Sequence, residues 1–419
     1  MLMSAMPAPE IAPIPDHVPP ELVYTFDQVY ADGFDSDPFG TYEKVRAEAP
    51  PIFFSPVSFN GPGKGVWYVT RPDDIRRTLQ DGDFFTTTMG YGGAAKAMPR
   101  RMIPLELDPP DNRKYRLLLT PLFSPSQMRR LESGIRETAN ELLDKVIANG
   151  RCDFAHDFAA VLPATVFMAL MGYPMERKAQ FLEWEDTFFH NLDFEARAAA
   201  GKKIEAMNLE MIGEKRRNPD EGLISKLAAI SFDDGTPVPD DDIQDMAWLL
   251  FIAGLDTVSS GLSHSFRYLA EHPDKKQELI DDPALIPQAV EELLRWHAWV
   301  NPPRTVREDT VLGGVQMKRG DEIMQLHTLA NRDSELFEHS MEVDFHREQN
   351  PHTAFGGGLH RCVGSHLARQ ELAIAIKVWL DRVPDYSLPP ADRDGLRYNT
   401  MGMFALKSLP LEWTPPSTS

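Results

Sequence analysis

Apolar residues spaced three and four positions apart recur along most of this chain and predict helices. The clearest patterns cover residues 38–46, 72–79, 108–116, 126–148, 154–171, 176–217, 240–270, 287–299 and 363–383. Short apolar runs bounded by glycine and proline predict strands at 52–54, 66–70, 304–306, 311–312, 315–317 and 322–324. We therefore expect a mainly α fold with small β-sheets.

The longest pattern, residues 240–270, predicts one continuous helix near the centre of the protein. Residues 248–255 are almost wholly apolar, and a helix that is apolar all round belongs in a core. Asp256 and Thr257 follow directly, and burying such groups without partners costs about 1–3 kcal/mol each. They are candidates for a buried polar site. The alternative is a threonine hydroxyl bonded back to the Ala253 carbonyl beside a surface aspartate.

Length and charge set broad limits. The chain has 419 residues, and nothing in it marks a repeat or a long linker, so we expect a single domain over 31–419. Prolines gather in the first 65 residues, which predicts an extended N-terminal segment over 1–30. The formal charge of −20 argues against nucleic-acid binding through bulk electrostatics.

The two cysteines, Cys152 and Cys362, form no disulfide framework and indicate a reducing compartment. Residues 1–20 lack the basic and apolar regions of a secretory signal. We find no window of about 18 apolar residues, so no membrane span is expected. A cytoplasmic location is the prediction, with Cys152 as a small buried hydrophobe.

The most informative stretch runs from residue 355 to 364, with three consecutive glycines before Cys362. Such glycines free the backbone for a close approach to a bulky group, and packing alone does not explain them. A helix is predicted to begin just after Cys362, and its N-terminus favours a thiolate over a thiol. A cysteine thiolate is the axial haem ligand that promotes O–O cleavage.

Residues 355–364 read Phe-Gly-Gly-Gly-Leu-His-Arg-Cys-Val-Gly, which resembles the haem-binding signature of the cytochromes P450 at every fixed position. Residues 253–257, 292–295, 343–345 and 351–368 resemble the soluble bacterial camphor-hydroxylase branch, in the same order. The resemblance implies a long central helix over the haem, about a dozen helices and small sheets.

The resemblance also implies haem b as cofactor, with Cys362 as its axial ligand. Phe355 and Gly356 belong to the haem-binding signature. The residues that match haem-propionate positions are cations or hydrogen-bond donors, as suits carboxylates: Arg116, Arg304 and His360.

Two further groups carry roles by the same resemblance. Asp256 and Thr257 match the acid–alcohol pair that delivers protons to iron-bound oxygen. Glu292, Arg295 and Arg347 match a structural ion-pair triad, although most pairs three residues apart are weak surface contacts.

Four apolar or small residues match pocket-wall positions, and the implied substrate is a small hydrophobic molecule of terpenoid size: Leu249, Gly254, Val300 and Met403. Arg100 stands where the camphor branch has a tyrosine, which argues against camphor itself. Arg100 either binds a polar substrate group or points outward from a loop that includes residues 90–95.

No flavin or nicotinamide fingerprint is present, so electrons must come from another protein. The resemblance implies a [2Fe–2S] ferredoxin with its reductase, which docks near Arg113 and Arg116, and a monomeric enzyme. The implied activity is hydroxylation with O₂. The alternatives are a peroxide-driven haem-thiolate enzyme, which typically lacks the acid–alcohol pair, and a non-catalytic haem sensor.

Overall fold

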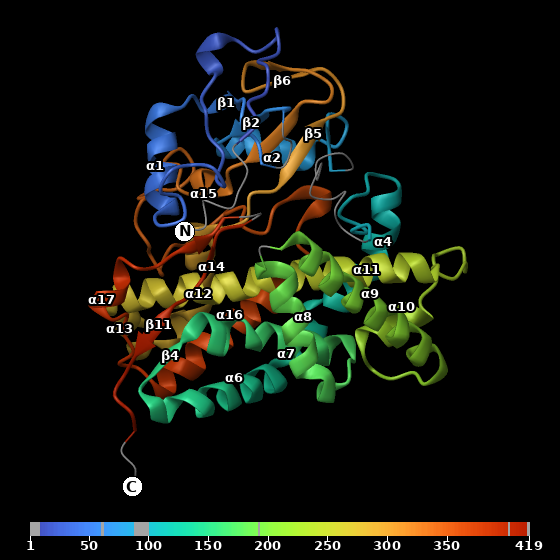
Figure 1. Ribbon diagram of the computed structural model, residues 1–419, viewed down its shortest axis with the longest axis vertical. Coiled ribbons are helices and arrows are strands. Elements are labelled where there is room, and N and C mark those ends of the chain that lie inside the picture. The colour runs from blue at the N-terminus through green and yellow to red at the C-terminus, as the bar shows by residue number, and fades with distance from the viewer. Residues whose placement is uncertain (1–8, 60–62, 88–99, 192, 401–402, 417–419) are drawn as a thin grey trace.

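The computed structural model describes residues 9–59, 63–87, 100–191, 193–400 and 403–416. Two helices in line, α11 (Asp240–Gly254) and α12 (Asp256–Glu271), run across the helical part of the molecule (Figure 1). The prediction of one continuous helix was wrong at Leu255, where φ is −102° and ψ is −73°. There the Thr257 hydroxyl donates to the Ala253 carbonyl at 2.7 Å, and such side-chain bonds compete with the helical backbone pattern.

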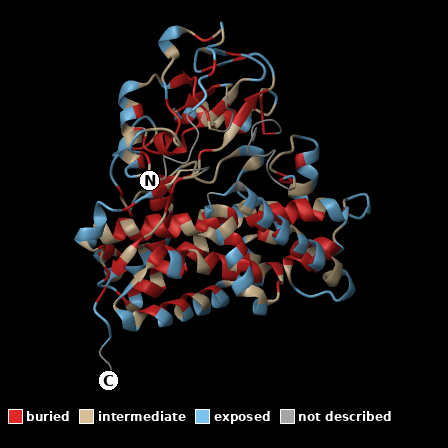
Figure 2. Cartoon of the chain, in the orientation of Figure 1, coloured by how far each residue is buried: buried red, intermediate tan, exposed pale blue. Residues whose placement is uncertain are grey.

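Residues 240–271 also correct the prediction that the chain holds no long apolar window. Among the described residues, this helical stretch alone is long and apolar enough to cross a membrane. Of its most apolar window, 67% is buried inside the protein. The apolar residues therefore serve the core (Figure 2).

Helices surround this central pair on several sides. The principal ones are α6 (Glu132–Val146), α7 (Val161–Met171), α8 (Lys178–His190), α9 (Phe194–Arg217), α10 (Leu223–Ala229), α14 (Ile286–His297) and α16 (Ser365–Arg382). Phe266 of α12 stacks on Phe154 with ring centroids 4.1 Å apart, and Trp379 of α16 meets Phe266 edge-on. Aromatic pairs of this geometry add about 0.5–1.5 kcal/mol each beyond area burial.

Two further predicted helices are divided in the structure, and the helical pattern with polar breaks predicted at residues 176–217 forms two main helices. Residues 126–148 form α5 (Pro125–Arg129) and α6, residues 154–171 form a π-helical turn, η4 (Ala155–Ala159), and α7, and residues 176–217 form α8 and α9. The remaining helices and 3-10 turns are η1 (Pro20–Leu22), α1 (Pro38–Glu48), α2 (Pro72–Gln80), α4 (Asp111–Leu119), η2 (Thr120–Phe123), η3 (Ile147–Asn149), η5 (Met175–Arg177), α13 (Pro273–Asp281), η6 (Pro283–Leu285), α15 (His327–Ala330), η7 (Gly358–His360) and α17 (Pro390–Arg393).

Five strands form the main sheet in the order β1 (Ile52–Ser55), β2 (Val66–Val69), β8 (Glu322–Gln325), β5 (Pro303–Val306) and β3 (Phe85–Thr86). Strands β2 and β8 are parallel, with Trp67 opposite Ile323, and the other neighbours are antiparallel. Together with α1 and α2, the sheet forms the upper part of Figure 1. Three two-stranded sheets pair β6 (Thr310–Leu312) with β7 (Val315–Met317), β9 (Tyr398–Asn399) with β10 (Ala405–Leu406), and β4 (Arg151–Asp153) with β11 (Pro410–Glu412).

The described part of the N-terminal segment runs along this sheet. Isolated bridges join Ile11 to Val57 and Val23 to Phe54, and η1 lies between them in sequence. The loop predicted at residues 90–95 lies outside the described residues.

A buried ion-pair cluster joins α14 to the segment near residue 347. Arg295 donates to both Glu292 oxygens at 2.7 and 2.8 Å, and Arg347 donates to Glu292 at 3.1 Å. Arg295 also donates to the carbonyls of Asn331 and Ser340. Both Glu292 and Arg295 are fully buried, so each charge depends on its partners.

Removing the Glu292 charge should therefore destabilise the fold strongly. We expect Glu292→Gln to lower the free energy of unfolding by about 3 kcal/mol or more, because Arg295 is left buried and unpaired. Urea unfolding followed by circular dichroism measures the change. Asp381→Asn, which breaks an exposed pair with Lys377 on α16, is the control and should cost less than about 1 kcal/mol. Equal losses in the two variants would contradict a structural role for the cluster.

Candidate active site

Cys362 lines a cavity between the break in the central helix and the glycine-rich bend. The cavity has a volume of about 320 Å³. The central helices contribute Leu249, Ala253, Gly254 and Thr257, and the bend contributes Phe355, Gly356, His360 and Cys362. Much of the remaining wall is apolar, including Leu105, Leu119, Phe123, Phe167, Leu170 and Val300. Such a lining suits a hydrophobic ligand held by few polar groups.

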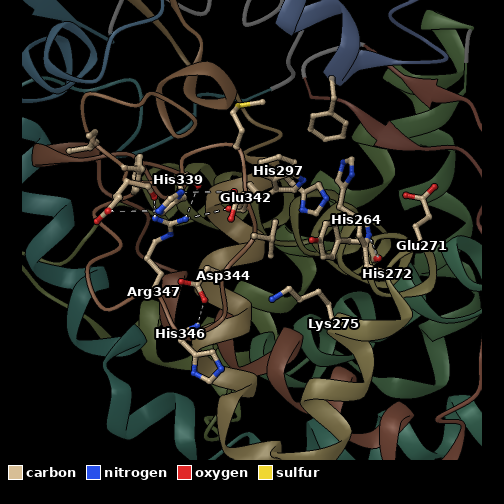
Figure 3. Close-up of a pocket in the computed structure, with 18 of the residues that line it drawn as sticks. His264, Glu271, His272, Lys275, His297, His339, Glu342, Asp344, His346 and Arg347 are labelled. Carbon is tan, nitrogen blue, oxygen red and sulfur yellow. Dashed lines mark hydrogen bonds and ion pairs between the residues drawn. The ribbon is translucent and has the colours of Figure 1, made fainter.

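A second cavity is larger, at about 1060 Å³, and lies between α12, α13, α14 and residues 336–349 (Figure 3). Charged and histidine side chains such as Lys275, His339 and Arg347 line it. Among the described residues, its lining includes neither Cys362 nor any other part of the glycine-rich bend. Proximity to Cys362, and not size, therefore identifies the candidate active site.

Each of the three glycines in the bend has a different backbone conformation or surrounding, which explains why glycine fits there. Gly356 has φ +64°, a conformation that favours glycine, whereas Gly357 is extended at φ −162°. Gly358 has φ +60°, and a Cβ there would lie 2.3 Å from the Leu79 carbonyl oxygen of α2. The prediction that packing does not explain these glycines is therefore wrong for Gly358, which permits close contact with α2.

The Cys362 backbone N–H donates to the Phe355 carbonyl at 2.9 Å, which closes the bend. The sulfur is accessible from the cavity, and α16 begins three residues later with Gly364 as its N-cap. Burial raises the pKa of the Cys362 thiol, although the Gly364 N–H and the Arg116, Arg369 and Arg361 charges oppose this. The Gly364 N–H at the helix N-terminus thus favours the thiolate, as predicted, but desolvation outweighs it and raises the pKa of the thiol.

Five basic side chains line the same cavity as Cys362, namely those of Arg116, Arg304, His327, His360 and Arg361. Arg116 lies in the last turn of α4, Arg304 on β5, and His360 in η7. Burial and the nearby Arg304 charge lower the pKa of His360 to about 4, so the ring is neutral at pH 7. Burial also lowers the pKa of Arg116, while the Cys362 charge opposes this. The cavity thus combines one thiol with three guanidinium groups and two imidazole rings, and burial lowers the pKa of both rings.

Asp256 and Thr257 lie where the central helix is broken. Thr257 lines the cavity, and its hydroxyl donates to Ala253 as the back-bonded alternative proposed. The same alternative predicted that Asp256 lies on the surface. This prediction was wrong, because Asp256 is buried and its Oδ1 atom lies 3.4 Å from the His190 Nε2 atom. The alcohol therefore lines the cavity, while the acid next to it in sequence is buried and has a basic partner.

A family model described as Cytochrome P450 matches residues 176–415. This chain belongs to the cytochrome P450 family. A "Probable cytochrome P450 127A1" of Sinorhizobium fredii (strain NBRC 101917 / NGR234) is 33% identical over 408 residues, covering 96% of this chain and 97% of the relative. A "Vitamin D(3) 25-hydroxylase" of Pseudonocardia autotrophica is 31% identical over 368 residues, covering 86% and 90%. The crystal structure of CYP101C1 superposes with a TM-score of 0.87 at 28% identity, covering 96% of this chain and all of that one.

Cytochromes P450 are haem-thiolate monooxygenases with haem b as cofactor, and the cavity of this P450 suits that group. Cys362 would bind the iron, while Arg116, Arg304 and His360 would meet the propionates. Within the described ranges, no group of three or more His, Cys, Asp and Glu side chains could hold a metal ion. Haem iron at Cys362 would favour loss of the thiol proton.

The predicted substrate-pocket residues separate into two groups. Leu249, Gly254 and Val300 line the cavity of this P450, whereas Met403 and Arg100 do not. Met403 bridges Val300 through its backbone, and its sulfur accepts a hydrogen bond from Ser260 at 3.6 Å. Its place in the predicted pocket wall was wrong, because its side chain packs behind that wall.

Arg100 is held away from the cavity by carboxylates. Its guanidinium donates to Asp245 at 2.7 Å and pairs with Asp241 and Glu205 at 3.3 and 3.6 Å. Both expectations for Arg100 were therefore wrong. It neither lines the cavity nor points freely into solvent, because the acidic start of α11 holds it.

Sequence reasoning missed three side chains near the site. Arg369 stacks over the Phe355 ring at 4.4 Å. Glu371 lines the cavity, and burial raises its pKa to about 8. His190 pairs with Asp256 across two helices. The Asp186–His190 spacing of four residues was a signal for a helical pair, but nothing in the sequence linked that pair to Asp256.

Replacing Cys362 should remove thiolate ligation of the haem. We expect Cys362→Ala to lose the red-shifted Soret band that the reduced carbon-monoxide complex shows with a thiolate ligand. Cys152→Ala is the matched control, because Cys152 lies on β4 away from the cavity and burial raises its pKa to about 12. The difference spectrum measures both, and a retained band in Cys362→Ala would show that the ligand is misassigned.

Proposed function

We propose that this cytochrome P450 hydroxylates a compact hydrophobic substrate, of terpenoid size, with O₂ and electrons from a [2Fe–2S] ferredoxin and its reductase. The observation that carries the proposal is the apolar cavity with Cys362 on one side and Thr257 on the other. Relatives named for different substrates show that family membership alone does not choose the substrate. The apolar lining from Leu249 and Val300 supports a hydrophobic one.

The haem, when bound to Cys362, supplies the oxygen chemistry, and the protein positions groups and protons around it. The Thr257 hydroxyl proton is engaged by Ala253, so its oxygen remains able to accept a hydrogen bond from a group in the cavity. Asp256, one residue away, is placed to hold a proton for delivery. This pair favours the route that uses O₂ and electrons over the peroxide-driven alternative.

The proposed ferredoxin site is the surface near the bend. Arg113 on α4 and Arg361 in the bend are exposed, as are the apolar side chains of Leu117 and Leu359 on the same two segments. A local positive patch on a chain of charge −20 supports docking of an acidic carrier. Arg116, which the sequence placed in this patch, faces the cavity instead.

We further propose that the enzyme is a cytoplasmic monomer. Its two cysteines are both free thiols, which supports a reducing compartment.

The substrate class can be tested by a spectral screen. We expect compact monoterpenoids and alkylbenzenes, such as fenchone, α-pinene and p-cymene, to shift the haem from low to high spin by displacing water from an apolar cavity. Polar compounds of equal size, such as simple sugars, are the control and should produce no shift. Absorbance titration measures the change, and product analysis with ferredoxin, reductase and NADH follows. Binding only of large or polar compounds would overturn the proposed substrate class.

Thr257 can be tested separately from substrate binding. Thr257→Ala should keep haem and substrate binding but release hydrogen peroxide in place of product, because the cavity loses its hydroxyl acceptor. Thr257→Ser keeps that hydroxyl and should keep most of the coupling. Product formed per NADH oxidised measures the effect, and an unchanged ratio in Thr257→Ala would overturn the proposed role. Wild-type turnover with peroxide but none with NADH and redox partners would favour the peroxide-driven alternative.

A further inference from the structure

A chain of polar side chains leads from Asp256, which follows the helix break and precedes the cavity-lining Thr257, to the protein surface. The His190 Nε2 atom lies 3.4 Å from Asp256 Oδ1, and its Nδ1 atom lies 3.2 Å from Asp186 Oδ1. The exposed fraction of the side chain rises outward, from 10% for Asp256 to 37% for His190 and 67% for Asp186. His190 therefore contacts both solvent and the buried carboxylate next to Thr257.

The fold places these groups with favourable electrostatics. His190 is the last residue of α8, where the helix dipole favours a cation. Asp256 is the first residue of α12, where the dipole favours an anion. Two helix ends of opposite polarity thus meet at the His190–Asp256 pair.

Other charged groups face the same point. Burial alone would lower the pKa of His190, but hydrogen bonds to Asp186 and Asp256 and the nearby Glu185 charge raise it to about 10. On α9, Arg197 is near enough for the Asp256 charge to oppose the lowering of its pKa by burial. From η4, His156 acts on Asp186 in the same way as His190, helping to lower its pKa.

The carboxylate Glu185 is almost fully buried beneath the pair. Burial and the Asp256 charge raise its pKa to about 8, while the His190 charge opposes them. The His190 ring therefore carries its second proton at neutral pH. Around it lie the carboxyl groups of Asp186, Asp256 and Glu185 and the Arg197 guanidinium.

We propose that His190 is a positioning residue that relays protons from solvent to Asp256. This inference rests on the proposed role of Asp256 and Thr257. In the step, the Nε2 proton passes to Asp256 Oδ1, the ring keeps its Nδ1 proton against Asp186, and the vacated Nε2 takes a proton from water. His190 holds its proton more tightly than a free histidine, so consumption of the Asp256 proton in the cavity drives the transfer.

The variant His190→Arg distinguishes a role in proton transfer from a role that needs only a positive charge beside Asp256. His190→Arg keeps a positive charge beside Asp256 but cannot release a proton at working pH. His190→Gln keeps hydrogen-bonding ability without charge. The control is His346→Gln, because His346 pairs with Glu278 at 2.8 Å away from the cavity.

The experiment compares O₂-dependent and peroxide-driven turnover of the haem-loaded enzyme, using the monoterpenoid or alkylbenzene that gives the largest spin shift. We expect His190→Arg to slow O₂-dependent product formation about tenfold or more and to increase the solvent isotope effect. Peroxide-driven turnover should not change, because peroxide brings its own protons. Wild-type O₂-dependent turnover should fall as the pH rises through about 10, where His190 loses its stored proton, and His190→Arg should lack this fall.

A second measurement is independent of turnover. In the diamagnetic ferrous carbon-monoxide form, nitrogen-15 NMR of the histidines should show a signal that titrates well above ordinary histidine and disappears in His190→Gln. Asp256→Asn should move this titration to lower pH, because it removes one stabilising charge.

The outcomes distinguish the two proposals. Wild-type rates, coupling and isotope effects in both His190 variants, with Asp256→Asn and Thr257→Ala slowed, would overturn the relay and leave the acid–alcohol role standing. Wild-type behaviour in all four variants would overturn both. Slow O₂-dependent turnover in His190→Arg beside normal His346→Gln supports the relay.

Discussion

The sulfur of Cys362 is the point on which the rest of the site depends. A thiolate at this depth is unfavourable by itself, because burial raises the pKa of the thiol more than the Gly364 N–H and nearby arginines lower it. A cation at the sulfur would favour the thiolate. Haem iron would supply that charge, and the guanidinium groups of Arg116 and Arg304 would meet the acidic side groups of the same cofactor. The site is thus built for a group that brings both signs of charge.

The broken central helix is the second part of the arrangement. A helical stretch apolar enough to span a membrane runs through the core, but the regular helix is interrupted at Leu255, beside the cavity. The Thr257 hydroxyl donates a hydrogen bond to the Ala253 carbonyl. Asp256 begins the next helix, and its carboxylate contacts His190. Local loss of helical hydrogen bonding therefore places polar chemistry inside an otherwise dry region.

Much of this could be predicted from the sequence, because the signals were local. The mainly α fold, most of the strands and the helix after Cys362 followed from periodicity and glycine or proline boundaries, whereas β3 and the pairing of distant strands in the main sheet did not. The family followed from a ten-residue pattern around Cys362 and was confirmed by comparison. The helix breaks at Leu255 and near Arg130 were not predicted from the apolar periodicity, and the first accompanies a local bond from the Thr257 hydroxyl to the Ala253 carbonyl. Arg100, Met403 and His190 were misplaced or missed because their partners lie more than 50 residues away in sequence.

The contact between Gly358 and Leu79 has a wider consequence. Leu79 belongs to α2, which accompanies the main sheet, whereas Cys362 leads into a helix of the large helical part. The loop that carries Cys362 therefore contacts both α2, beside the main sheet, and the helical part of the molecule. A movement of one part against the other would therefore be transmitted to this loop, which carries the cysteine that would hold the haem iron.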